Sequence, residues 1–214
     1  MSNEIDIRQR AWAKLRRHAH QLLARGYLRL NAAEFGSSKE PDITGRLCQA
    51  VDEFMAATDA PSWVTRYALR DDPKLNVRGL EGESRPRIDI EIERVQRGRR
   101  PLFRFEAKRL GPKHSLTSSK GYLGSEGIGA FLSNYYELTH PEAGMLGYIQ
   151  SDNIAHWHQK LLNELAKDPV SHGYDKSQGL TEDILASGLS TWRSEHMKND
   201  DSSLMIWHTL LLFH

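Results

Sequence analysis

The sequence predicts an α/β fold, with helices packed around a sheet that includes a β-hairpin. Three observations support this class. Apolar residues recur at helical spacing in four separate stretches, they alternate with polar residues in two strands between positions 87 and 108, and the stretch 143–150 is mostly apolar, as in a strand buried on both faces. With 214 residues, of which 39% are hydrophobic, the chain is long enough for one substantial core, so we expect a single domain over residues 1–214.

Composition excludes several classes of protein. The N-terminus lacks the apolar stretch of a signal peptide, and no run approaches the ~20 apolar residues that cross a bilayer, so we expect a soluble cytoplasmic protein without a membrane partner. The single cysteine, Cys48, excludes an internal disulfide framework and a multi-cysteine zinc site. It lies in an apolar helical stretch, where we expect it in the core.

The N-terminal segment, residues 1–38, is predicted to be a helix followed by a loop. Apolar residues in its first part fall on one helical face, namely Ile7, Ala11, Leu15, Ala19 and Leu22. A second helix is predicted over residues 40–57, with Pro41 in its first turn. This helix opens the predicted core of the domain, residues 40–150.

Three strands are predicted after the second helix. Residues 62–70 are rich in β-branched and aromatic side chains, and strands at 87–94 and 102–108 form the alternating hairpin. After a loop rich in Gly, Pro and Ser, a third helix is predicted from residue 125, and the strand 143–150 completes the core. The predicted order from residue 40 is therefore helix, strand, strand, strand, helix, strand.

The remaining residues, 151–214, are predicted to extend the same domain. Residues 153–167 carry an apolar stripe at helical spacing, a polar loop follows, and two further strands at 190–197 and 203–213 are predicted to form a hairpin. His208 lies in an apolar strand, so we expect it to be a core histidine rather than a ligand.

The hairpin at 87–108 places charged residues in register. A turn centred between Arg97 and Gly98 brings the apolar faces of the two strands together and sets Asp89 directly opposite Glu106. A shift by one residue would place isoleucines against charges throughout the pair, so the apolar pattern favours this register.

Two carboxylates that face each other across strands repel by roughly 0.2 to 1 kcal/mol even when exposed, so a compensating charge is expected. Arg104 and Lys108 flank the pair and would balance it as part of a charged surface ladder. The alternative is a divalent cation, since paired carboxylates are ligands of a hard ion such as Mg²⁺, and Lys108 on the same face would then reach a bound phosphate. Glu91 and Glu93 are expected not to be ligands, because Glu91 faces Arg104 and pairs with it.

An Asp on one strand and Glu-x-Lys on the next, within this order of elements, resemble the motif of the PD-(D/E)xK nuclease superfamily, whose fold is that of many restriction endonucleases. The motif maps onto Asp89, Glu106 and Lys108, and Ile88 stands where the family has a proline that varies among its members. The resemblance covers residues 40–150 and implies a restriction-endonuclease-like αβββαβ core. It also implies a nuclease that hydrolyses phosphodiester bonds with Mg²⁺ or Mn²⁺.

The resemblance assigns roles to individual residues. It implies that Asp89 and Glu106 hold one or two metal ions, together with the main-chain carbonyl of Ala107, and that Lys108 orients the attacking water or stabilises the developing charge. An acid from the preceding helix often adds to such sites. Glu40 is the candidate, because it continues the buried helical stripe, and an acid that only favours the helix N-terminus is the alternative.

The charge distribution indicates where nucleic acid would bind. The chain carries a net charge of +1, yet residues 85–120 hold eleven Lys or Arg against four acids. We expect the hairpin tip and the following, mobile loop to hold the phosphate backbone without reading bases. The residues concerned are Arg97, Arg99 and Arg100 at the tip and Lys113 and Lys120 in the loop.

By analogy with the superfamily, the expected partners are nucleic acid, with DNA preferred, and a second copy or a partner protein that targets or activates the nuclease. A bacterial restriction or phage-defence effector is the role that this analogy implies. The main alternative is a non-catalytic module of the same fold that binds nucleic acid or a partner subunit. A histidine-based nuclease built on His156 and His158 is disfavoured, because no acid cluster neighbours them in the sequence.

Overall fold

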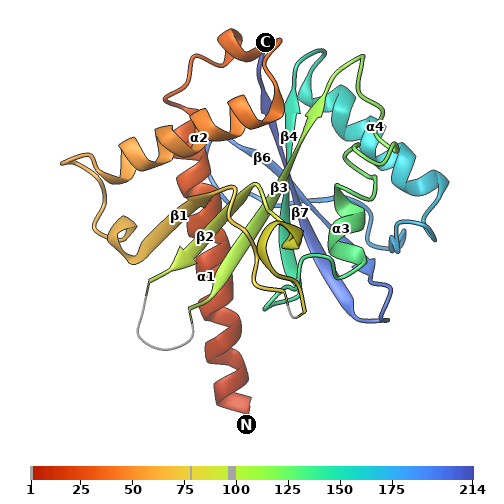
Figure 1. Ribbon diagram of the computed structural model, residues 1–214, viewed down its shortest axis with the longest axis horizontal. Coiled ribbons are helices and arrows are strands. Elements are labelled where there is room, and N and C mark those ends of the chain that lie inside the picture. Colours follow the sequence, from red (N-terminus) through yellow and green to blue (C-terminus); the bar gives the residue numbers. More distant parts are fainter. Residues whose placement is uncertain (1, 78, 96–99) are drawn as a thin grey trace.

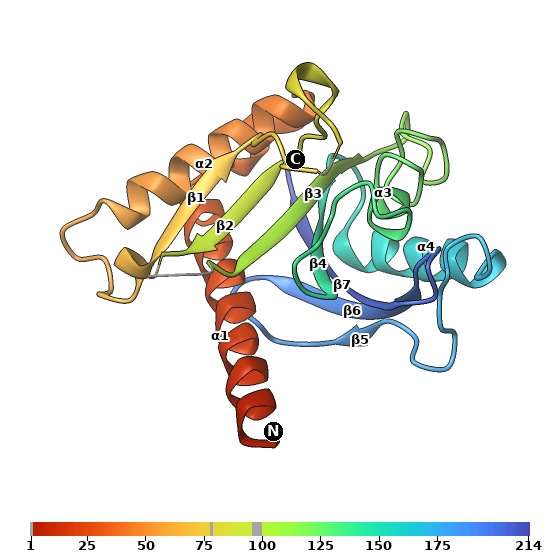
Figure 2. The ribbon, with the colours of Figure 1, turned by 60° about the horizontal axis from the view of Figure 1, so that its bottom comes forward.

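The computed structural model describes residues 2–77, 79–95 and 100–214 of the chain. In this part of the chain, seven strands form one open, mixed sheet, and helices cover both of its faces (Figures 1 and 2). The helices are α1 (Ser2–Tyr27), α2 (Glu40–Met55), α3 (Ile128–Leu132) and α4 (Ile154–Lys167). The strands are β1 (Tyr67–Asp71), β2 (Ile90–Arg94), β3 (Leu102–Leu110), β4 (Glu142–Ile149), β5 (Thr181–Glu182), β6 (Ser190–Met197) and β7 (Ser203–Leu212). This arrangement confirms the predicted α/β class.

The strand order in the sheet is β1-β2-β3-β4-β7-β6-β5. β1, β2 and β3 are antiparallel neighbours, β3, β4 and β7 run parallel, and β7, β6 and β5 are again antiparallel. Strands from residues 151–214 thus extend the same sheet, and β7 lies beside β4 within it. From α2 to β4 the order is helix, three strands, helix and strand, as the sequence predicts.

The helices α2 and α4 begin where the local sequence favours it. Pro41 stands in the first turn of α2, where its missing N–H costs no hydrogen bond. Asn153 caps α4, because its side chain accepts a hydrogen bond from the backbone N–H of His156 (2.9 Å). Each helix then buries an apolar face, which includes Cys48 of α2, as predicted, and Leu161 of α4. None of the described helices combines the length and the apolar composition needed to cross a membrane.

The strand predicted over residues 62–70 starts later than expected. A 3-10 turn occupies Val64–Arg66, and the backbone N–H of Val64 donates to the carbonyl of Pro61 (3.0 Å). β1 begins only at Tyr67. A proline at the start of a turn presets its backbone, and here this local preference outweighs the β-branched residues that follow.

The helix predicted from residue 125 is reduced to the five residues of α3. Asn134 adopts a left-handed conformation (φ 60°), which a right-handed helix cannot contain. The chain therefore leaves the helix before Tyr135 and Tyr136. These two tyrosines consequently do not continue the helical stripe that the sequence suggests.

The sheet separates two apolar cores. One lies between the sheet and the helices α1 and α2, and the other between the sheet and the helices α3 and α4. β4 contributes to both, since Leu146 and Tyr148 face the first core while Met145 and Ile149 face the second. The prediction that this strand is buried on both faces is confirmed.

The hairpin strands β2 and β3 have one apolar and one polar face, as predicted. Phe103 and Phe105 of β3 pack into the first core. The alternate residues Arg104, Glu106 and Lys108 face the opposite layer, where they are only 8, 5 and 7% exposed. Of the two alternatives, a charge-balanced ladder on the surface is therefore excluded for these residues. These charges have to be compensated inside the protein.

Candidate active site

Asp89 is the residue immediately before β2, and the hairpin register brings it to the edge of β3. The pairing of the two strands sets Ile90 opposite Phe105, which confirms the predicted register. One carboxylate oxygen of Asp89 accepts a hydrogen bond from the backbone N–H of Ala107 (2.6 Å). Because the N–H and C=O groups of one strand residue point to the same edge, the carbonyl of Ala107 faces this side as well.

Lys108 joins Glu106 of the same strand to Glu40 of α2. Its ammonium donates to Oε1 of Glu106 (2.7 Å) and to Oε1 of Glu40 (3.1 Å). The second oxygen of Glu40 accepts a hydrogen bond from the backbone N–H of Arg109 (3.1 Å). Figure 1 shows why these groups meet, since α2 begins beside the end of β3. The structure thus gathers Asp89, Glu106, Lys108 and Glu40 in one place.

Tyr136 is a further member of this cluster, and the sequence analysis missed it. Its hydroxyl donates to Oε2 of Glu106 (2.9 Å), and the side chain is buried. Tyr136 reaches the carboxylate because the chain leaves α3 at Asn134. The pair Ser133–Asn134 is the signal that could have located this turn, since both residue types favour turns over helix interiors.

The cluster holds more acid than base. Among the described residues, three carboxylates (Asp89, Glu106 and Glu40) surround the single ammonium of Lys108. Burial, and after it the charge of Asp89, raises the pKa of Glu106 to about 8. Burial likewise raises the pKa of Asp89 to about 6, against the opposing effect of Lys108. The paired acids therefore retain a proton near neutral pH unless a further cation replaces it.

Burial alone would lower the pKa of Lys108, but the neighbouring carboxylates, Glu106 first among them, outweigh it and raise this pKa above its ordinary value. The ammonium is thus fixed in its charged form. It is a proton-bearing, cationic donor at the base of the site rather than a general base.

The donor set suits a hard divalent cation. Asp89 and Glu106 offer carboxylate oxygens, and the carbonyl of Ala107 faces the same edge of β3. In the described part of the chain, no group of three or more His, Cys, Asp or Glu side chains is arranged so that it could hold a metal ion as a protein cage by itself. Mg²⁺ needs no such cage, because it usually keeps several waters and binds through one or two carboxylates plus substrate phosphate.

The other two acids of the hairpin are fully paired with arginines, as predicted for Glu91. Arg104 donates to Glu91 (3.0 Å), Arg70 bonds to both Glu91 (3.1 Å) and Glu93 (2.5 Å), and Arg100 bonds to Glu93 (3.0 Å). We call these five residues the arginine ladder. Their arrangement agrees with the prediction that Glu91 and Glu93 are not metal ligands.

Two hollows open onto the candidate site. The tyrosine pocket, of about 510 Å³, is lined by Glu106, Lys108, Tyr135 and Tyr136 together with Arg87 and Glu126. The lysine pocket, of about 450 Å³, is lined by Lys39, Arg109, Lys113, Lys120 and His114 together with Glu40. Lys108 and Glu126 line both hollows, so the two meet at Lys108.

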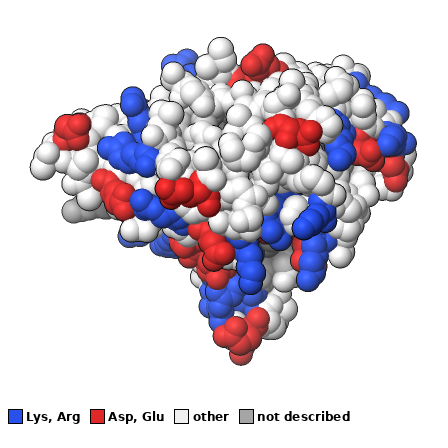
Figure 3. All heavy atoms as spheres, turned by 90° about the horizontal axis from the view of Figure 1, so that it is seen from above, with Lys and Arg blue, Asp and Glu red and all other residues white. Residues whose placement is uncertain are grey.

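The residues predicted to hold nucleic acid have different surroundings. Lys113 and Lys120 line the lysine pocket, next to the site. Arg100 is engaged with Glu93 in the arginine ladder, so its charge is already balanced within the protein. Arg97 and Arg99 lie outside the described residues. On the face shown in Figure 3, basic and acidic side chains lie side by side rather than in separate areas.

The loop that carries Lys113 and Lys120 is folded tightly rather than being the mobile loop expected. The backbone N–H of Leu123 donates to Leu116 C=O (2.8 Å), and a Cβ added at Gly124 would collide with the carbonyl of Ser118. Tyr122 fastens the loop to the core of the sheet, because its hydroxyl bonds to the ring of buried His208 (3.0 Å). His208 is thus a core histidine, as predicted.

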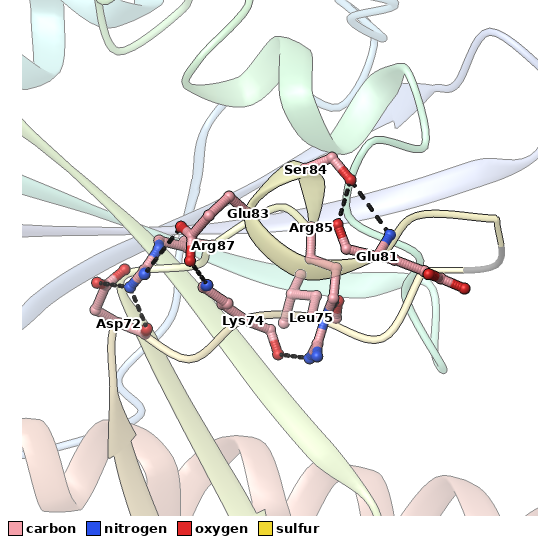
Figure 4. Close-up of polar contacts among 8 residues, drawn as sticks. All are labelled: Asp72, Lys74, Leu75, Glu81, Glu83, Ser84, Arg85 and Arg87. Carbon is pink, nitrogen blue, oxygen red and sulfur yellow. Dashed lines mark hydrogen bonds and ion pairs between the residues drawn. The ribbon is translucent and has the colours of Figure 1, made fainter.

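A second loop, between β1 and β2, fixes the approach of the chain to Asp89. Figure 4 shows the guanidinium of Arg85 reaching back to the carbonyls of Lys74 (2.8 Å) and Leu75 (3.0 Å). Lys74 also forms an ion pair with Glu83, and Arg87 pairs with Asp72 (2.5 Å). The two arms of the loop are therefore tied together just before the chain reaches Asp89.

Comparisons of the chain with protein-family models, with curated proteins and with solved structures find no match. The case for a function consequently depends on the geometry and charge of the site itself.

Proposed function

We propose that this protein is a metal-dependent nuclease that hydrolyses phosphodiester bonds of nucleic acid, with Asp89, Glu106 and Lys108 as its catalytic residues. The observation that carries the proposal is the charge imbalance of the cluster, in which the carboxylates of Asp89, Glu40 and buried Glu106 surround one ammonium. Buried acids with raised pKa values next to an open pocket are characteristic of functional sites. A cation and a phosphate together would restore the balance.

The order of elements around the cluster supports the same proposal. Asp89 immediately precedes β2, and Glu106 and Lys108 lie on β3; in chain order these residues come after α2 and before α3 and β4. We propose that residues 40–150 form a restriction-endonuclease-like core, to which the hairpin of β6 and β7 adds strands beyond β4. Fold likeness alone assigns no activity, so the residues of the site have to account for the chemistry.

Asp89 and Glu106, with the carbonyl of Ala107, would hold Mg²⁺ or Mn²⁺. When bound, such an ion supplies an acidic centre that activates water and neutralises phosphate charge. In the hydrolysis itself, a water oxygen forms a bond to phosphorus while the ester P–O bond breaks. The leaving oxygen takes a proton and the attacking water loses one, so that a hydroxyl and a phosphate monoester remain.

Lys108 has the position and the protonation state for a role at the reacting phosphate. Its ammonium lies at the junction of the two pockets and is held charged by Glu106 and Glu40. We propose that it donates to a phosphate oxygen and stabilises the charge that builds up in the transition state. Orientation of the attacking water by the same ammonium would act in the same direction.

Glu40 and Tyr136 are proposed as positioning residues. Both carboxylate oxygens of Glu40 are engaged, one by Lys108 and the other by the backbone of Arg109, so this acid fixes the ammonium. Tyr136 holds one oxygen of Glu106 and leaves the carboxylate a single preferred orientation. Such support keeps catalytic groups in place before substrate arrives.

One observation favours the rival function, a non-catalytic binding module of the same fold. Lys108 already bonds to two carboxylates, as a purely structural ion pair would. The two functions differ in the consequence of removing Lys108 or Glu106, since a binding module has no hydrolysis to lose.

The test is a nuclease assay on plasmid, linear DNA, single-stranded DNA and RNA, each with Mg²⁺, Mn²⁺ or EDTA. We expect cleavage of at least one substrate with a divalent ion, none with EDTA, and loss of cleavage in Glu106→Gln and Lys108→Ala. Glu53→Gln serves as the control, because Glu53 is a half-exposed acid of α2 that pairs with Arg46. Cleavage that persists in both site variants would reject the catalytic assignment.

A further inference from the structure

We propose that the tyrosine pocket is a subsite for an unstacked nucleobase, and that the substrate is therefore single-stranded nucleic acid. The inference rests on the proposed nuclease function, and it adds the class of substrate. The strand would cross Lys108, with one base in the tyrosine pocket and the neighbouring backbone in the lysine pocket.

The proposed reacting groups lie deep in the two pockets. Glu106 is 5% exposed, Lys108 7% and Tyr136 5%, so these groups lie at the bottom of the pockets. A phosphate must enter a pocket to reach them. Duplex DNA is stiff, with a persistence length of about 150 base pairs, whereas a single strand bends freely into such a space.

An exposed aromatic side chain, Tyr135, lines the tyrosine pocket. Tyr135 is 51% exposed, lines the tyrosine pocket, and lies 5.4 Å from the ring of buried Tyr136. An exposed aromatic ring beside a phosphate-binding groove is how proteins bind unpaired bases without regard to sequence. The pocket volume of about 510 Å³ falls within the ~300–1,000 Å³ range of ligand sites.

Tyr135 is held at the pocket by its neighbours on both sides. The side-chain amide of Asn134 donates to Asp200 (2.6 Å) and fixes the turn that follows α3. On the other side, the hydroxyl of Tyr136 is tied to Glu106. The ring of Tyr135 is therefore presented to the solvent side of the pocket by a constrained backbone, as a stacking platform requires.

The lysine pocket is lined by more basic than acidic side chains. Its lining holds Lys39, Arg109, Lys113 and Lys120 in addition to Lys108, against the acids Glu40 and Glu126. A local excess of ammonium and guanidinium groups binds the phosphate backbone and carries no sequence information.

Binding is measured by fluorescence anisotropy in EDTA, so that no hydrolysis is needed. The probes are labelled single strands of DNA and of RNA, a duplex of the same sequence, and an abasic single strand of equal length. The variants are Tyr135→Ala, Tyr135→Phe and the double variant Lys113→Ala/Lys120→Ala. Lys176→Ala is the control for loss of an exposed lysine outside both pockets.

We expect the wild type to bind the single strands about tenfold more tightly than the duplex. Tyr135→Ala should weaken single-strand binding by about fivefold or more, the equivalent of about 1 kcal/mol of stacking, while Tyr135→Phe keeps the ring and the affinity. On the abasic strand Tyr135→Ala should bind like the wild type. The double lysine variant should lower the slope of log affinity against log salt by about 0.7 for each lysine, and Lys176→Ala should leave it unchanged.

Equal binding of single strands by Tyr135→Ala and wild type would overturn the subsite, and so would equal affinity for duplex and single strand. The assay also separates this inference from the proposed function. Binding that depends on Tyr135 in a protein that cleaves no nucleic acid with any metal would support the subsite and reject the nuclease. Cleavage of duplex by Tyr135→Ala at the wild-type rate would reject the subsite and support the nuclease.

Discussion

Two charged clusters lie next to one another on the same face of the β2–β3 hairpin, and they differ in their balance of charge. In the arginine ladder, three guanidinium groups pair with the carboxylates of Glu91 and Glu93. In the candidate site, one ammonium pairs with Glu106 and Glu40, and the nearby carboxylate of Asp89 accepts a backbone hydrogen bond. Glu91 and Glu93 of the ladder and Glu106 of the candidate site are all buried, so the difference does not come from the access of these acids to water.

The balance of charge distinguishes the arginine ladder, an internal ion-pair network, from the site that we propose to be functional. Burying a carboxylate is costly unless a partner compensates it, and the ladder provides partners for each of its acids. The candidate site instead keeps Asp89 and Glu106 together, where burial and mutual repulsion raise their pKa values. We propose that a cation from outside the chain completes this second arrangement.

The largest expected effect concerns activity. Glu106→Gln and Asp89→Asn should each reduce nuclease activity by about a thousandfold or more, since each removes a charge that the reaction needs and leaves the shape almost unchanged. Glu91→Gln removes an equally buried acid from the ladder. When rates are normalised to the folded fraction, it should stay within about threefold of the wild type. Equal losses in all three variants would erase the distinction between the clusters.

For stability we expect the reverse order, with Glu91→Gln more destabilising than Glu106→Gln. Removing one partner of a buried ion pair leaves the other charge uncompensated, so Glu91→Gln should lower the free energy of unfolding by about 3 kcal/mol. Glu106→Gln should cost far less in EDTA, because the raised pKa of Glu106 keeps it mostly protonated at pH 7 and the neutral amide resembles that form. Urea unfolding at pH 7 measures both values. A Glu106→Gln variant as unstable as Glu91→Gln would contradict the comparison.

The pH dependence of stability should also distinguish the candidate site from the arginine ladder. The pKa of Glu106 is raised to about 8 and that of Asp89 to about 6, so the folded state binds more protons than the unfolded state at intermediate pH. The stabilising effect of these protons is present below the unfolded pKa values and is lost as pH rises to about 8. In EDTA, the wild type should lose roughly 2 kcal/mol more stability than Glu106→Gln between pH 5 and pH 9. Urea titrations at several pH values test this, and parallel curves for the two proteins would contradict it.

The smallest effect is expected from the hydroxyl of Tyr136. Its hydrogen bond lowers the pKa of Glu106, so Tyr136→Phe should raise that pKa further and move the acidic limb of the pH–rate profile to higher pH. We expect a loss of about tenfold in rate at pH 7, with recovery at higher pH. A rate loss that is the same at every pH would mean that the hydroxyl serves packing alone.

Local patterns in the sequence predicted much of the fold and most of the candidate site. The period-two alternation of 87–94 and 102–108 set the register that places Asp89 beside β3, and the helical stripe of residues 40–57 led to Glu40. These features depend on neighbours in the chain or on one hairpin turn, which a sequence specifies directly.

What the sequence did not reveal depends on contacts between distant segments. The polar face of the hairpin is buried because the chain after α3 covers it, and Arg104 donates to the backbone carbonyl of Glu137 there. The role of Tyr136 requires the turn at Asn134 to interrupt an otherwise helical pattern. The position of β7 beside β4 likewise follows from packing, since periodicity does not say which strands pair.

The most direct test of the central claim is a calorimetric titration of Mn²⁺ into the protein at pH 7, in two buffers of different ionisation enthalpy and without nucleic acid. We predict that the wild type binds Mn²⁺ and releases about one proton, because the cation replaces the proton held by Asp89 and Glu106. Asp89→Asn and Glu106→Gln should lose this binding, and Glu91→Gln should keep it. Absence of Mn²⁺ binding in the wild type, or undiminished binding in both site variants, would contradict the account.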